Sequence, residues 1–98
     1  MQDNECKTKA VHVRIEGRVQ GVWYRGWTVG EASKRGLCGW VRNRSDGSVE
    51  ALIAGPKNDV NEMLEACWKG PPAAKVTGVF PRPAEETAEA GFSALPTL

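Results

Sequence analysis

The stretch GRVQGVWYR, residues 17–25, combines residue types that suit the binding of a phosphate group. Glycines let backbone N–H groups approach a ligand closely, and successive amides in a curved loop make a site for an anion. If a helix begins here, its N-terminus adds unpaired N–H groups, and Arg25 adds a planar, permanently charged fork. The stretch therefore predicts a site for a dianionic tetrahedral group. A glycine-rich turn followed by a solvated arginine is the simpler alternative, since no GK[ST] sequence of a Walker loop follows.

A second polar residue, Asn43, lies near the end of a predicted strand, on the side that the helices are expected to cover. A carboxamide is unusual on such a face. It could cap the turn before Asp46-Gly47, which is a frequent role of asparagine, or it could serve a site at the end of the sheet. The residues by themselves leave both alternatives open.

The elements that must position these residues follow from the hydrophobic periodicity of the chain. Val11, Val13 and Ile15 alternate with polar residues, which is typical of a half-buried strand. The dipeptide Asp46-Gly47 between two extended segments is typical of a tight hairpin turn. The pattern predicts strands over 10–17 and 75–82, a hairpin over 37–55, helices over about 25–35 and 57–70, and a short edge strand over 91–95.

Apolar residues gather on one face of each predicted helix. In the first helix this face holds Arg25, Val29, Ala32 and Gly36. In the second helix the apolar pattern ends with Trp68, which is therefore predicted to lie in the core. Asn58 or Asp59 is expected to cap the second helix.

The element order β-α-β-β-α-β predicts the fold class α+β. With right-handed crossovers it gives a ferredoxin-like split βαβ sandwich, a four- to five-stranded antiparallel sheet with two helices on one face. The first and third strands are expected to be central neighbours. We expect one domain over residues 1–98, in which residues 1–9 form a flexible N-terminal tail.

Composition restricts the class of partner. The formal net charge is +1, which argues against a dedicated nucleic-acid-binding protein. No run of about 18 apolar residues and no apolar leader is found, so we expect no membrane partner and no secretion. Three scattered cysteines (Cys6, Cys38 and Cys67) without a CxxC pair are typical of an intracellular protein. We expect a cytoplasmic monomer without a metal or other cofactor, since no cluster has metal-ligand spacing.

Two ordered motifs, GRVQGVWYR and the later GWVRNRSDGSVE, carry a family resemblance. Over roughly residues 10–82 the chain resembles the acylphosphatase family. The resemblance implies hydrolysis of a small acyl phosphate, with Arg25 and Asn43 as catalytic residues. It also implies a phosphate cradle made by the backbone N–H groups of Gln20, Gly21, Val22, Trp23 and Tyr24. Tyr24 stands where many members have phenylalanine, and Trp23 occupies the variable position of the motif.

An acyl phosphate releases a carboxylate, whose conjugate acid has a pKa of about 4, so the leaving group needs no general acid. The single histidine, His12, is predicted on the sheet face opposite Asn43. Two other classes of function stay open on the same fold. One is a non-catalytic phosphate-ligand module. The other is an RNA-binding module, whose open sheet face would carry His12, Arg14, Trp40, Arg42 and Arg44.

Overall fold

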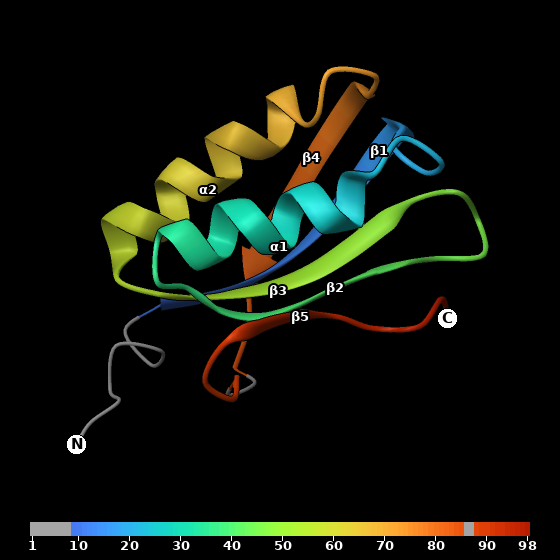
Figure 1. Ribbon diagram of the computed structural model, residues 1–98. Helices are drawn as coiled ribbons and strands as arrows, with labels where there is room; N and C mark the ends of the chain where they lie inside the picture. Colours follow the sequence, from blue (N-terminus) through green and yellow to red (C-terminus); the bar gives the residue numbers. More distant parts are fainter. Residues whose placement is uncertain (1–8, 86–87) are drawn as a thin grey trace.

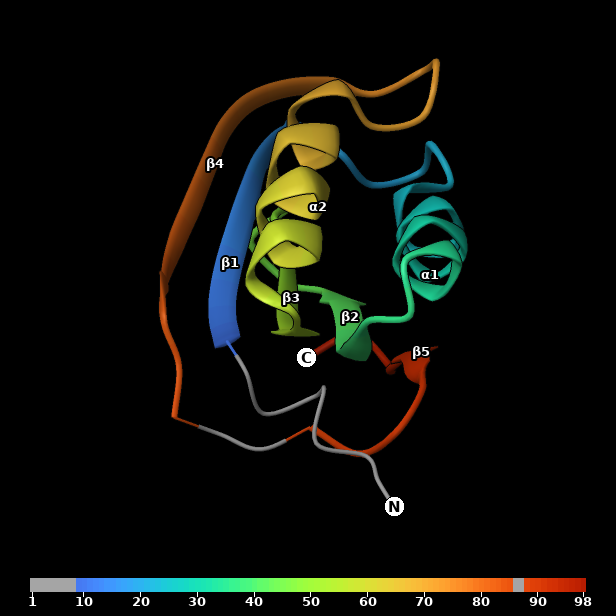
Figure 2. The ribbon, with the colours of Figure 1, turned by 90° about the vertical axis from the view of Figure 1, so that its left-hand side faces the viewer.

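A computed structural model describes residues 9–85 and 88–98 of the chain. It consists of a five-stranded sheet with both helices packed on one face (Figures 1 and 2). The elements are β1 (Lys9–Arg18), α1 (Tyr24–Lys34), β2 (Cys38–Asn43), β3 (Val49–Gly55), α2 (Lys57–Lys69), β4 (Lys75–Pro83) and β5 (Phe92–Ala94). The predicted α+β, ferredoxin-like fold is confirmed, including the short last strand.

The strand order across the sheet is β4-β1-β3-β2-β5, so β1 and β3 are central neighbours as predicted. The first four strands pair antiparallel, whereas β5 pairs parallel to β2. The prediction of a wholly antiparallel sheet is therefore wrong for the fifth strand. Strand β4 ends at the same end of the sheet at which β2 begins (Figure 2). The chain then crosses to the β2 edge of the sheet, and β5 starts at that end. Strand β5 therefore runs parallel to β2.

The core lies between the sheet and the two helices. Alternate residues of the central strands point to the helices, and their partners across the ladder do the same. The pairs Val11↔Ile53, Val13↔Ala51 and Ile15↔Val49 fix this register, and all six side chains are buried. The other large contributors are Val19, Tyr24, Val41, Val60, Met63 and Cys67.

The buried face of α1 differs from the predicted one. It consists of Tyr24, Thr28 and Ala32, whereas Val29 is only half-buried. Thr28 tolerates burial because its hydroxyl donates a 2.8 Å hydrogen bond to the carbonyl of Tyr24, one turn earlier. The periodicity of apolar residues alone does not detect a threonine that satisfies its own hydroxyl.

Helix α2 has nearly the predicted bounds, but its N-cap residue and the burial of Trp68 differ from the prediction. It begins at Lys57, and Pro56 takes the N-cap position expected for Asn58 or Asp59. The first helical bond runs from the Val60 N–H to the Pro56 carbonyl, so the helix starts directly after the proline. Trp68 was predicted in the core, but its side chain is 53% exposed.

Most of the predicted N-terminal tail, and Cys6 with it, lies outside the described residues; Lys9 is the first residue of β1. The other two cysteines, Cys38 and Cys67, are both buried. No helix within residues 9–85 and 88–98 is long and apolar enough to cross a membrane.

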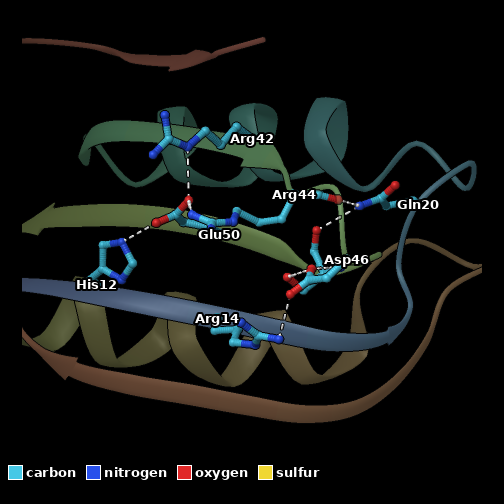
Figure 3. A network of polar contacts seen from close by, with 8 residues as sticks. His12, Arg14, Gln20, Arg42, Arg44, Asp46 and Glu50 are labelled. Carbon is cyan, nitrogen blue, oxygen red and sulfur yellow. Dashed lines mark hydrogen bonds and ion pairs between the residues drawn. The ribbon is translucent and has the colours of Figure 1, made fainter. Parts of the chain in front are cut away.

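The sheet face away from the helices carries a network of charges centred on Glu50 (Figure 3). Glu50 is only 7% exposed, and its carboxylate contacts His12 Nε2 at 2.6 Å, Arg42 Nε at 2.9 Å and Arg44 Nη1 at 2.8 Å. Burial alone raises the pKa of a carboxyl group, but the hydrogen bonds from Arg44, Arg42 and His12 outweigh it. They hold the pKa of Glu50 at about 2.

This network predicts acid-sensitive stability. Because the pKa of Glu50 is lower in the folded state, its contribution is complete above the unfolded pKa of about 4.3 and is lost as pH falls through about 2. We expect Glu50→Gln to lower the free energy of unfolding by about 1–3 kcal/mol at pH 7, with a smaller difference at pH 3. Urea unfolding at both pH values measures this. The exposed Glu65→Gln is the control, and a pH-independent difference for Glu50→Gln would contradict the prediction.

Candidate active site

Gly17, near the end of β1, and Gly21, in the loop between β1 and α1, have different roles. Gly17, at a β-bulge against β4, has φ +118°, and a Cβ there would overlap the carbonyl oxygen of Lys75. It is therefore needed for close packing of two backbones. Gly21 has φ +76° in open space, so its role is the conformation of the loop itself. Only Gly21 fits the prediction of a glycine that shapes a ligand-binding loop.

The N-terminus of α1 is left without a side-chain cap. Trp23 is the N-cap residue, in a left-handed conformation with φ 70° and ψ 26°, and its side chain makes no capping bond. The first turn contains no acidic residue, whereas the first turn of α2 contains Asp59. Arg25 stands in this first turn of α1. The partial positive charge of the helix end therefore adds to that of the guanidinium, which suits an anion.

Asn43 is the last residue of β2, paired with Val49 of β3 and on the same face as Val41. The turn that follows is stabilised by another residue. Asp46 Oδ1 accepts hydrogen bonds from the Ser48 amide at 2.9 Å and from its hydroxyl at 2.6 Å. The alternative that Asn43 caps this turn is therefore not the one adopted.

Arg25 and Asn43 face a common cavity of about 270 Å³. It is lined by Val19, Gln20, Gly21, Trp23, Tyr24, Arg25, Gly26, Asn43 and Ala94. Of the five residues expected to supply backbone N–H groups, four line the cavity; Val22 does not, and it packs against the core. In the part of the chain that the structure describes, neither the Arg25 guanidinium nor the Asn43 carboxamide has a hydrogen-bond or ion-pair partner. Their donors are thus available to a ligand.

Gln20 contributes its side chain in a way that the sequence analysis missed. Its Nε2 donates 2.8 Å hydrogen bonds to the carbonyls of Arg44 and Ser48, on either side of the β2–β3 turn (Figure 3). The carboxamide thereby attaches the loop before α1 to the strand end that carries Asn43. The only signal in the sequence was a residue with two N–H donors inside a glycine-flanked loop.

Tyr24 attaches the start of α1 to the end of α2. Its hydroxyl donates a 2.6 Å hydrogen bond to the carbonyl of Cys67, in the last turn of α2. That carbonyl is one of those that a helix end leaves without an intrahelical partner. Burial raises the pKa of Tyr24 well above its ordinary value, so its hydroxyl stays protonated as a donor. The hydroxyl that distinguishes Tyr24 from phenylalanine is therefore structural.

Among residues 9–85 and 88–98, no three His, Cys, Asp or Glu side chains are grouped so as to hold a metal ion. His12 lies on the open face, in contact with Glu50, and does not line the cavity that holds Arg25 and Asn43. What the cavity brings together is a guanidinium, a carboxamide and a helix N-terminus.

Comparison with known proteins identifies the family of the chain. The family model described as acylphosphatase matches residues 11–94, which include both candidate catalytic residues. The chain belongs to the acylphosphatase family. A relative from Rhodospirillum rubrum named acylphosphatase is 54% identical over 90 residues, covering 92% of this chain and 99% of the relative.

Solved acylphosphatase structures share the fold. The crystal structure of acylphosphatase from Bacillus subtilis superposes with a TM-score of 0.83 at 39% identity, covering 88% of this chain and 97% of that one. The structure of an acylphosphatase from Coxiella burnetii gives a TM-score of 0.86 at 32% identity, with 89% and 92% coverage. The acylphosphatase fold thus extends over nearly the whole chain.

The attachment made by Gln20 leads to a prediction about stability. Gln20→Ala removes two donors but leaves each carbonyl its backbone partner, so we expect a loss of about 1 kcal/mol in the free energy of unfolding. Gln20→Glu sets a carboxylate against two carbonyl oxygens, and we expect a loss of about 2 kcal/mol or more. Urea unfolding measures both. The control is Asn58→Asp, an exposed amide-to-acid change near the N-terminus of α2. Equal stability of Gln20→Glu and the wild type would contradict the attachment of the loop by Gln20.

Proposed function

We propose that the protein hydrolyses the carboxyl–phosphate anhydride of small acyl phosphates, without a metal or other cofactor, to a carboxylate and inorganic phosphate. The observation that carries the proposal is the shared cavity of Arg25 and Asn43 at an uncapped helix N-terminus. A cationic fork beside free backbone N–H groups suits the phosphoryl end of such a substrate. Membership of the acylphosphatase family supports the same reaction.

Arg25 binds the phosphoryl oxygens together with backbone N–H groups of the loop. These are the N–H groups of Gln20, Gly21, Trp23 and Tyr24, which line the cavity, and that of Val22, whose side chain packs against the core. Charge develops on these oxygens in the transition state of phosphoryl transfer, so donors fixed in position stabilise it more than the ground state. The absence of an acidic residue from the first turn of α1 supports this role, because a carboxylate there would repel the substrate.

Asn43 holds the attacking water in line with the bond that breaks. A neutral carboxamide is too weak a base to take the proton of that water, so the proton passes to a phosphoryl oxygen of the substrate. The new bond forms between the water oxygen and phosphorus. The bond from phosphorus to the acyl oxygen breaks, and its electron pair leaves with the carboxylate, which needs no proton at neutral pH.

The open sheet face supports hydrolysis over the RNA-binding alternative. The basic residues expected to contact RNA are engaged within the protein: Arg42 and Arg44 bind Glu50, and Arg14 binds Glu16 and Asp46. Arg42 also lies 4.7 Å from the ring centroid of Trp40. Binding to a base or phosphate would break these pairs at a cost. The other alternative, a non-catalytic phosphate-ligand module, is tested by measuring whether the protein hydrolyses an acyl phosphate.

The protein is further proposed to act as a cytoplasmic monomer, as expected from its composition. Size-exclusion chromatography with light scattering tests the monomer, for which a mass near 10.6 kDa is expected.

Removal of the cationic fork is expected to abolish most of the activity. Arg25→Ala lowers kcat/KM for benzoyl phosphate at least about a hundredfold, which corresponds to about 3 kcal/mol of transition-state stabilisation. Arg25→Lys keeps the charge but loses the two-point contact, so it recovers little. Loss of benzoyl phosphate absorbance in the presence of EDTA measures the rate. Arg82→Ala, on the outer strand β4, is the matched control, and a near-normal rate for either Arg25 variant would refute the assignment.

Removal of the water-positioning group is expected to act on turnover rather than on binding. Asn43→Ala lowers kcat about a hundredfold, while the inhibition constant for inorganic phosphate changes by less than about threefold, because Arg25 and the loop remain. Steady-state kinetics with phosphate as a competitive inhibitor separates the two effects. Equal losses in kcat and in phosphate affinity would assign Asn43 to phosphate binding instead.

A further inference from the structure

The side chain of Trp23 is 71% exposed, more than any other large apolar side chain in the described chain. Among the described residues it is also the only one other than glycine with a positive φ, at 70°. An exposed indole and a left-handed backbone each oppose stability at this position, and neither is offset by a capping bond. Such a residue at the edge of a site suggests a role in function.

The indole of Trp23 is held against the first turn of α1. A Cβ at residue 26 would overlap its Nε1 and lie 2.6 Å from its Cε2, so the ring lies directly over Gly26. Glycine is a poor helix former, and here its missing side chain provides the space that the indole occupies. The ring therefore has a defined position, although one side of it faces solvent.

Trp23 lines the same cavity as Arg25 and Asn43. The phosphoryl end of a substrate would occupy the polar part of this cavity, beside the guanidinium and the loop. Apolar groups make up much of the remaining lining, from Val19, Trp23 and Ala94. The acyl end of the substrate must extend toward them, because it is joined directly to the phosphoryl group.

We propose that Trp23 determines specificity for the acyl group, and that its indole stacks on aromatic acyl groups. This inference rests on the proposed function. A flat aromatic acyl group can stack on the indole and shield it from water, whereas an acetyl group is too small to cover the ring. Among small acyl phosphates, those with an aromatic acyl group are therefore the preferred substrates.

The test compares kcat/KM for benzoyl phosphate with kcat/KM for acetyl phosphate, and uses their ratio. Trp23→Gly removes the indole in a residue that adopts positive φ freely, and we expect the ratio to fall about tenfold. Trp23→Phe keeps an aromatic ring, and we expect a ratio between those of wild type and Trp23→Gly. Trp68→Ala removes an exposed tryptophan from α2, outside the site, and should leave the ratio within about twofold of wild type.

Two results for Trp23→Gly would overturn this inference alone. One is an unchanged kcat/KM ratio with unchanged rates. The other is an equal loss of kcat/KM for both substrates, which would mean that Trp23 only stabilises the conformation of the loop. Both results presuppose that the wild-type protein hydrolyses both substrates, so the proposed function would stand. If the wild-type protein turned over neither substrate, the proposed function and the specificity of Trp23 would fail together.

Discussion

The candidate site depends on a fixed spacing between two elements that are separate in the sequence. Arg25 belongs to the first turn of α1, and Asn43 is the last residue of β2. Gln20 joins them, since its carboxamide bonds to the two carbonyls that flank the turn after Asn43. Tyr24 makes a second attachment, to α2. A misplacement of about 1 Å between reacting groups can cost about a hundredfold in rate, so these side-chain bonds to backbone bear directly on function.

Within the described part of the chain, the arginines on the open face of the sheet are paired with acids, whereas Arg25 on the helical face is not. On the open face three arginines are held by acids, with the buried Glu50 binding two of them. On the helical face Arg25 has no acidic partner among the described residues. An acid beside Arg25 would compete with a phosphoryl group for the same donors. A net charge of only +1 is therefore compatible with a positive site, because the three arginines of the open face are paired with acids.

Local patterns predicted most of the fold, because each element depends on a few neighbouring residues. They also indicated Arg25 and Asn43 as candidates, whereas the catalytic roles of these two residues were implied by the family resemblance. The alternation around Val13 and the dipeptide Asp46-Gly47 suffice for a strand and a hairpin. The direction of β5 depends on the route of the chain after β4, and no residue of β5 encodes it. The bond from Tyr24 to Cys67 spans 43 residues and the bonds of Gln20 span 24 and 28, so no local pattern reveals them.

The junction between β1 and α1 breaks several local rules within a few residues. The helix has no side-chain cap, Trp23 is left-handed and exposed, and Gly26 stands in the first turn. Each choice costs stability, on the order of 1 kcal/mol for a missing cap or a helical glycine. The same choices leave backbone N–H groups and an aromatic surface open to a ligand. A phosphate bound there would take the place of the missing cap and would thereby stabilise this junction.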